Sequence, residues 1–278
     1  SCGCQTPWMF WHHLIEENPT VTRSAIVTGS TSGIGLAVAR TLAEKGCNIL
    51  LNGFGDAAEI EKIKKDIQKE FSVKVHYHDA DMTQPDEITA LVEDCQATFG
   101  SVDILINNAG IQHTAAIDKF PVDKWDQILA INLSSNFHTV RSALPVMKAQ
   151  GSGRIVNISS VHGHVASVNK SAYVAAKHGV LGLTKVIALE TADTAITCNA
   201  VCPGWVRTPL VQKQIDAFAM REGVSEDEAI SRMLGEKQPS KNFVLPTQVG
   251  QAVAYLCSDA ASEIRGSTIN VDGGWLAQ

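Results

Sequence analysis

The chain has 278 residues, of which 45% are apolar and 19% charged, and its formal net charge at pH 7 is −6. These values predict a soluble globular protein with a substantial core, and an acidic chain without a basic run is unlike a nucleic-acid-binding protein. No apolar run approaches the ~20 residues of a membrane span, and the seven scattered cysteines favour a reducing, cytoplasmic compartment over a disulfide framework.

Residues 1–20 form an unusual N-terminal extension without Lys or Arg. The extension therefore lacks the positive start of a signal peptide and the arginines of a mitochondrial presequence. Cys2, Cys4, His12 and His13 are residue types that bind metals, but we expect an extension of unknown role and no metal site. The fold is therefore read from residue 21 onward.

The rest of the chain alternates short apolar runs with longer amphipathic segments. The apolar runs predict seven strands, at residues 24–28, 48–52, 73–78, 102–106, 154–158, 195–201 and 267–271. Segments of helical period predict helices at residues 34–45, 56–70, 85–99, 121–149, 171–191 and 246–258, with Pro145 kinking the fourth or ending it early. This alternation predicts one α/β domain over residues 21–278, a doubly wound parallel sheet of about seven strands with helices on both faces.

Residues 206–241 break this alternation with two amphipathic helical pieces between the sixth strand and the last helix. Ligands bind at the carboxyl ends of the strands in such sheets, so we expect this insertion to be a substrate lid. An oligomer surface is the alternative.

The loop after the first strand reads TGSTSGIG at residues 28–35. Glycines between a strand and its helix allow the backbone to approach a pyrophosphate, which the helix N-terminus attracts. A tight turn without a ligand is the alternative. The acidic residue expected at the end of the second strand is absent, because residues 52–55 read NGFG and Asp56 is expected to cap the next helix. No Arg or Lys lies at residues 30–32 or 52–55, which favours NAD over NADP.

Tyr173 and Lys177 are four residues apart, so they project from one face of the helix predicted at residues 171–191. A phenol has an ordinary pKa of about 10, and a neighbouring ammonium lowers it toward a range useful for proton transfer. Ser160 follows the strand at residues 154–158 and can hydrogen-bond the same substrate oxygen. The alternative is an ordinary helix with an exposed Tyr and Lys.

Together these motifs resemble the short-chain dehydrogenase/reductase family from about residue 22 onward. The family's motifs occur in order as TGSTSGIG, NNAG at 107–110, INLS around Asn132, Ser160, YVAAK at 173–177 and PGWVRTP at 203–209. The resemblance implies a Rossmann fold and hydride transfer with Tyr173 as the general acid/base. Ser160 would hold the reacting oxygen, Lys177 would lower the Tyr173 pKa, and Asn132 would support a water relay from Lys177.

The same resemblance implies which residues contact the cofactor. Asp81 would contact adenine, and residues 203–208 the nicotinamide carboxamide. The implied contacts are Gly29, Thr31, Gly33, Ile34, Gly35, Phe54, Asp81, Asn108, Gly110, Tyr173, Lys177, Pro203, Val206 and Thr208.

Further motifs, such as HGHVASVNKSAYVAAKHG at residues 162–179, resemble the bacterial family members that oxidise D-3-hydroxybutyrate to acetoacetate with NAD. The substrate would be a small hydroxy or keto acid, and the enzyme a homotetramer. The implied substrate contacts are Gln112, Ser160, His162, Lys170, Tyr173, Trp205, Gln214 and Trp275. A cation at Lys170, just before a helix N-terminus, is electrostatically unfavourable there, which favours a functional role. His164 has no assigned role.

Two alternatives remain at this stage. A 3-oxoacyl reductase or sugar-alcohol dehydrogenase of the same family would not require Gln112, His162, Lys170 and Gln214 together. A non-catalytic NAD-binding module would be expected to have lost Tyr173, Lys177 or Ser160, all of which are present.

Overall fold

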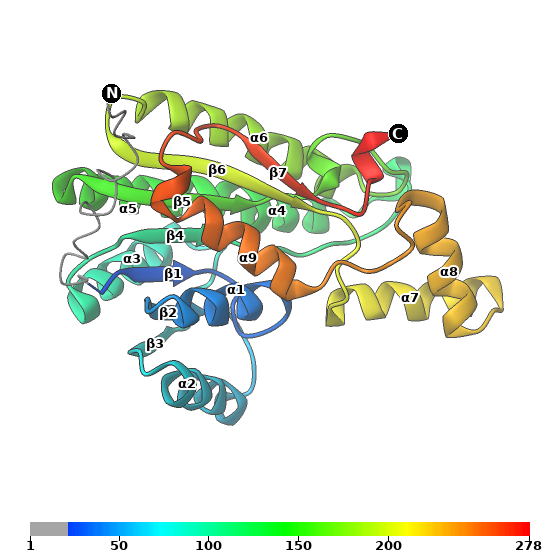
Figure 1. Ribbon diagram of the computed structural model, residues 1–278. Coiled ribbons are helices and arrows are strands. Elements are labelled where there is room, and N and C mark those ends of the chain that lie inside the picture. Colours follow the sequence, from blue (N-terminus) through cyan, green and yellow to red (C-terminus); the bar gives the residue numbers. More distant parts are fainter. Residues whose placement is uncertain (1–21) are drawn as a thin grey trace, which may run out of the picture.

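The computed structural model describes residues 22–278 and shows a seven-stranded parallel sheet between two layers of helices (Figure 1). The strand order is β3-β2-β1-β4-β5-β6-β7, which confirms the doubly wound fold expected from the sequence. The predicted N-terminal extension lies outside the described residues. The strands are β1 Ser24–Val27, β2 Asn48–Asn52, β3 Val75–His78, β4 Ile104–Asn107, β5 Ser152–Ile158, β6 Ala195–Pro203 and β7 Thr268–Val271.

Alternate side chains of the central strands enter two separate cores. Ala25 and Val27 of β1 pack in one core, and Ile26 between them packs in the other. The first core lies under α1 (Gly33–Glu44), α2 (Ala57–Phe71) and α9 (Pro246–Leu256). The second lies under α3 (Pro85–Phe99), α5 (Ser135–Gln150) and α6 (Ser171–Glu190). Burial on both faces explains why these strands are continuously apolar.

The helix predicted at residues 121–149 is present, but a π-helical turn divides it. The chain forms α4 (Val122–Leu129), a π-helical turn at Ala130–Ser134 and then α5. Pro145 does not end α5, which continues to Gln150 and closes at Gly151 in the left-handed conformation. Pro145 is exposed, so solvent can hydrogen-bond the carbonyl left without a partner by its missing N–H.

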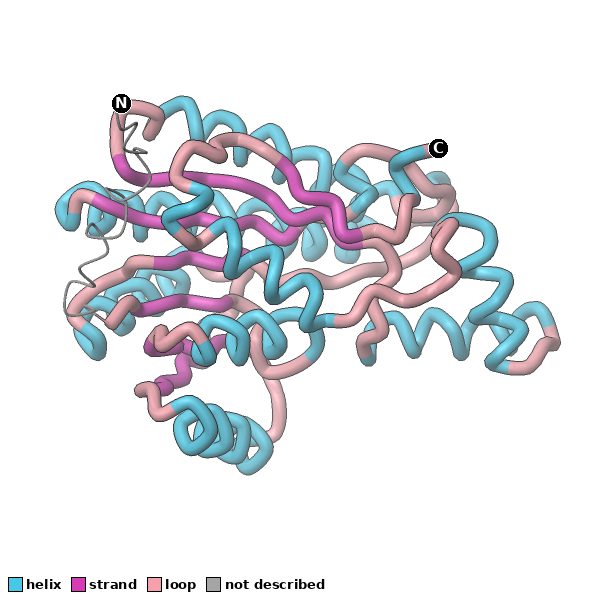
Figure 2. The backbone as a smooth tube through the Cα atoms, in the orientation of Figure 1, coloured by secondary structure: helices cyan, strands magenta, loops and turns pink. Residues whose placement is uncertain are grey.

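The insertion forms α7 (Pro209–Glu222) and α8 (Glu226–Lys237), which lie beyond the carboxyl ends of the strands (Figure 2). The two helices share an apolar cluster that includes Ile215 and Met233. The chain leaves the main domain and rejoins it at adjacent points, because Val206 and Val244 form a parallel bridge.

Among the described residues, α6 is the one helix whose length and composition would also suit a membrane span. This helix is an exception to the sequence prediction that no apolar run approaches the length of a membrane span. In this fold, however, 44% of the helix's apolar window is buried, and core helices of soluble proteins meet the same criteria.

Short helical turns complete the fold at Ile117–Lys119, Val161–Gly163, Asp259–Ala261 and Trp275–Ala277.

Candidate active site

The first of two adjoining cavities lies where the strand order reverses, between the ends of β1 and β4. Sheets of this kind bind dinucleotides at this position. The glycine loop forms one wall, and Phe54, Asp81, Asn108 and the α6 face form the others.

The glycine loop can take this path only without side chains. A Cβ added to Gly35 would lie 2.2 Å from the Gly29 carbonyl oxygen, and Gly29 itself has φ +62°. The N-cap residue Ser32 makes no side-chain hydrogen bond to the first turn of α1, and that turn carries no acidic residue. Its N–H groups are therefore available to an anion, as expected for a dinucleotide pyrophosphate.

Asn52 explains why no acidic residue stands at the end of β2. Its side chain is fully buried and accepts a hydrogen bond from the Gly29 N–H at 3.2 Å. It also donates to the carbonyls of Ala80 at 2.9 Å and His78 at 3.2 Å. The amide therefore braces the glycine loop from beneath, a role that needs both a donor and an acceptor and that a carboxylate cannot fill.

Most of the expected cofactor residues line this first cavity. The exceptions are Pro203 and Val206, which line the second cavity instead. Ile34, Tyr173 and Thr208 line both cavities, so a ligand in one reaches the other. Among the described residues the lining of the first cavity contains no Arg, and its one Lys is Lys177.

Tyr173 and Lys177 lie on successive turns at the start of α6, as the spacing predicted. The Lys177 Nζ is 5.7 Å from the Tyr173 ring centroid and donates a 2.7 Å hydrogen bond to the Ile158 carbonyl at the end of β5. The Ser159 hydroxyl donates to the Lys177 carbonyl at 3.1 Å, which fixes α6 against that strand end. Ser160 follows and accepts a hydrogen bond from the His162 N–H at 3.2 Å.

Burial controls the ionisation of this pair. It raises the pKa of Tyr173, an effect that the adjacent Ser160 hydroxyl partly offsets. It also lowers the pKa of Lys177 to about 8. Loss of solvent around the phenol dominates in the protein alone, and the lowering of the Tyr173 pKa by Lys177 stays a prediction.

Asn132 is buried in the π-helical turn between α4 and α5. Its amide pairs with both backbone groups of Ile111, accepting from the N–H and donating to the carbonyl, each at 2.9 Å. Asn132 thus holds the segment that precedes Gln112. π-Turns inside helices often occur at functional sites. The relay from Lys177 stays a prediction.

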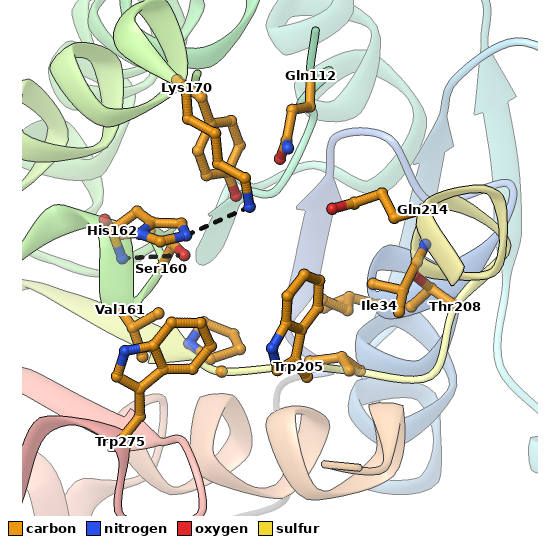
Figure 3. A pocket seen from close by; sticks show the side chains of 16 residues that line it. Ile34, Gln112, Ser160, Val161, His162, Lys170, Trp205, Thr208, Gln214 and Trp275 are labelled. Atoms are coloured by element: carbon orange, nitrogen blue, oxygen red, sulfur yellow. Dashed lines mark hydrogen bonds between the residues drawn. The ribbon is translucent and has the colours of Figure 1, made fainter. Parts of the chain in front are cut away.

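The second cavity contains all the expected substrate residues (Figure 3). Lys170, Gln112 and Gln214 extend toward one space from three different segments. The Lys170 Nζ lies 3.5 Å from the His162 Nε2 and 5.1 Å from the Trp205 ring centroid. The expected residues that line the cavity are Gln112, Ser160, His162, Lys170, Tyr173, Trp205, Gln214 and Trp275.

Two buried donors on residues that line this cavity, the Gln112 Nε2 and the Trp205 Nε1, have no hydrogen-bond partner among residues 22–278. A buried donor without an acceptor costs about 1–3 kcal/mol. Among the described residues nothing offsets that cost, so an acceptor-bearing ligand would relieve it.

The electrostatics of the second cavity suit one anion. Burial, reinforced by the nearby Lys170 charge, lowers the pKa of His162 to about 4, so this imidazole is neutral at pH 7. Burial lowers the pKa of Lys170 to about 8, so its amine remains largely cationic at pH 7. One cation surrounded by neutral donors is a suitable setting for a single carboxylate.

Sequence reasoning missed part of the lining. Val161 and Val211 also line the second cavity, and Ser159 lines both cavities. Apolar wall residues carry no motif of their own, so no sequence signal would have separated them from the core. Ser159 is adjacent to Ser160, which is the one signal that could have identified it.

Comparison with known proteins agrees with this architecture. A family model described as short chain dehydrogenase matches residues 23–218. The D-beta-hydroxybutyrate dehydrogenase of Cupriavidus necator is 55% identical over 257 residues, which cover 92% of this chain and 98% of that protein. The D-beta-hydroxybutyrate dehydrogenase of Rhizobium meliloti is 51% identical, with coverage of 93% and 100%. The crystal structure of an actinorhodin polyketide ketoreductase variant with NADPH matches with a TM-score of 0.87 at 36% identity, covering 92% of this chain and 98% of that one.

Proposed function

This chain belongs to the short-chain dehydrogenase family, and from that premise we propose that it oxidises D-3-hydroxybutyrate to acetoacetate reversibly with NAD. The observation that carries the substrate assignment is that Lys170, Gln112 and Gln214 extend into one space (Figure 3), in a cavity that Tyr173 also lines. A 3-hydroxy acid has its carboxylate two carbons from the reacting carbinol. A cation and two amides that line the same cavity as the phenol can bind such a carboxylate. The names of the two relatives that are more than 50% identical support the same substrate.

NAD, when bound in the first cavity, supplies the hydride acceptor. Ser160 hydrogen-bonds the substrate oxygen and Tyr173 exchanges a proton with it. In the reductive direction Tyr173 acts as a phenol, and the raised pKa keeps it protonated. In the oxidative direction it must accept a proton as phenolate. The cationic form of Lys177, one helical turn away, stabilises the phenolate.

The direct test is NADH absorbance when the purified protein is mixed with NAD and D-3-hydroxybutyrate. We expect turnover with the D enantiomer and little with the L enantiomer or with neutral 2-butanol. Faster turnover of a sugar alcohol, or of a 3-oxoacyl thioester in the reductive direction, would favour the other family activities and contradict the proposal.

We predict a preference for NAD over NADP. In the first cavity the described lining offers no Arg, and the amine of its one Lys, Lys177, donates a hydrogen bond to the Ile158 carbonyl. A 2′-phosphate would therefore be desolvated without a cationic partner. The measurement is kcat/KM for each cofactor at saturating D-3-hydroxybutyrate. Equal values, or a higher value with NADP, would contradict the prediction.

We also predict an alkaline loss of kcat/KM that is specific to carboxylate substrates. Only the cationic form of Lys170 pairs with a carboxylate, and that form predominates below the Lys170 pKa of about 8. Above that pH, kcat/KM for D-3-hydroxybutyrate should fall by up to about tenfold per pH unit. Lys177 also titrates near pH 8, so a neutral alcohol provides the control for its contribution. Parallel pH profiles for the two substrates would contradict the role of Lys170.

A homotetramer in the cytoplasm is part of the proposal. Phe137, Val186 and Leu189 are exposed apolar side chains on α5 and α6, and a groove between these two helices continues the apolar face. Exposed apolar side chains gathered on one face support an interface between copies of the chain. The five cysteines among the described residues are buried free thiols, which suits a reducing compartment. Native mass spectrometry would report the assembly.

A further inference from the structure

Gln238 is a fully buried amide that lies in neither cavity, at the point where the lid helix α8 ends. Its Oε1 accepts a 2.9 Å hydrogen bond from the backbone N–H of Trp205. Its Nε2 donates to the carbonyl of Asn242. One side chain therefore joins the substrate wall at Trp205 to the segment through which the lid rejoins the main domain.

Two glycines make room for this side chain. A Cβ added to Gly204 would lie 2.6 Å from the Gln238 Oε1, and one added to Gly273 would lie 2.6 Å from the Gln238 Cγ. The amide is thus enclosed between the end of β6 and the turn that leads to Trp275. The Trp205 and Trp275 rings lie with centroids 6.0 Å apart, tilted by 39°, and form an aromatic wall of the substrate cavity. Gln238 holds the backbone at the Trp205 end of that wall.

The segment that follows α8 and leads back to Val244, called here the lid exit, begins with a tight turn that Gln238 closes. The Gln238 carbonyl accepts a 2.8 Å hydrogen bond from the N–H of Lys241, a non-glycine residue in the left-handed region at φ +55°. Such a conformation is strained for a residue with a side chain and persists only where its surroundings hold it. Two further bonds fix the exit, from the Ser240 N–H to Gly273 and from the Val244 N–H to Trp205.

We propose that Gln238 is a positioning residue for substrate binding. Its amide fixes the Trp205–Trp275 wall and the lid exit in one geometry, and the substrate clamp depends on that geometry. The inference rests on the proposed function, because it concerns the binding of the same hydroxy acid. Gln238 touches neither cavity, so its effect reaches the substrate only through Trp205, Trp275 and the lid.

The first test is Gln238→Met, which keeps the volume of the side chain and removes both hydrogen bonds. We expect KM for D-3-hydroxybutyrate to rise by about tenfold or more, while kcat and the Kd for NAD stay within about threefold. Gln251→Met, an exposed position in α9 outside both cavities, is the matched control. Unchanged KM, or equal loss of NAD and substrate affinity, would overturn the proposal.

The second test, Gln238→Glu, keeps the proposal testable if the methionine variant does not fold. A protonated carboxyl can accept from Trp205 and donate to Asn242, whereas a carboxylate cannot donate. Burial raises the pKa of such a carboxyl. We expect the ratio of variant KM to wild-type KM to be near one at low pH and to rise with pH. A ratio that does not change with pH would contradict the role of the donated hydrogen bond.

A substrate-free measurement separates this inference from the proposed function. If the wild type does not oxidise D-3-hydroxybutyrate, the proposed function fails. In that case the fluorescence emission of the tryptophans can still show whether Gln238 holds Trp205 in place. The emission of Gln238→Met should shift to longer wavelength than that of the wild type, and the shift should disappear in a Trp205→Phe background. No shift, or a shift that persists in that background, would overturn the positioning role.

Discussion

Tyr173→Phe should lower kcat for D-3-hydroxybutyrate by about 10²–10⁴-fold, the usual contribution of a positioned proton-transfer group. The phenol is the titratable hydroxyl that lines both cavities, and no other tyrosine lines either of them. Phenylalanine keeps the ring that packs edge-to-face on His162 at 6.1 Å and faces Lys177 at 5.7 Å. The Kd for NAD should therefore change by no more than about twofold.

Tyr255→Phe is the matched control, because Tyr255 is exposed on α9 and outside both cavities. Steady-state rates give kcat, and quenching of protein fluorescence by NAD gives Kd. If Tyr173→Phe kept turnover within a few-fold of wild type, proton transfer would have to be assigned to another group. If NAD affinity fell in parallel with turnover, the loss would reflect a distorted cofactor cavity.

The sequence was sufficient to predict the sheet and the Tyr173–Lys177 helix. Short apolar runs separated by amphipathic segments have only one common arrangement, a parallel sheet between helices. Residues four apart necessarily share a helix face, so the relative placement of Tyr173 and Lys177 followed from their spacing. The substrate cavity was predicted from family resemblance, since Gln112, Lys170 and Gln214 are far apart in the chain and no local pattern brings them together.

Other features depend on tertiary contacts that a linear pattern does not contain. Helical periodicity passes smoothly through residues 121–149, so the π-turn at Ala130–Ser134 left no signal. That turn is held by the pairing of Asn132 with Ile111, a contact across 21 residues. The raised pKa of Tyr173 likewise reflects how completely the fold buries the phenol. In the sequence Asn52 stands where an acidic residue is expected. Only the structure shows that its amide hydrogen-bonds the glycine loop and the Ala80 carbonyl.

The local structure around Lys170 shows that its position serves something other than the helix. Lys170 is the N-cap residue of α6 and makes no capping hydrogen bond with its side chain. It follows Asn169, which is in the left-handed region at φ +63° and whose carbonyl accepts a 3.0 Å hydrogen bond from the Ala115 N–H. This turn directs a cation to a helix N-terminus, where a cation is disfavoured. A carboxylate ligand in the second cavity would offset that cost.

Lys170→Ala should therefore raise KM for D-3-hydroxybutyrate and lower kcat/KM by roughly 2–5 kcal/mol, a factor of about 30 to several thousand. The loss is large because the carboxylate would leave water and meet no cation. Lys170→Met separates charge from packing, since methionine can still cover the Trp205 face that the Lys170 amine approaches at 5.1 Å. Both variants should show nearly the same loss if the charge is responsible.

Three measurements distinguish a lost clamp from a damaged helix start. Because the Lys170 side chain caps nothing, its removal leaves the α6 backbone hydrogen bond from Val174 to the Lys170 carbonyl intact, and the Kd for NAD should stay near wild type. Turnover of neutral 2-butanol, poor in the wild type, should not fall further. Lys62→Ala on the exposed face of α2 should change kcat/KM by less than about 0.5 kcal/mol. Equal losses of kcat/KM with 2-butanol and D-3-hydroxybutyrate would mean that Lys170 supports the fold of the site. The assignment of a carboxylate substrate would then be contradicted, because no cation would bind the carboxylate.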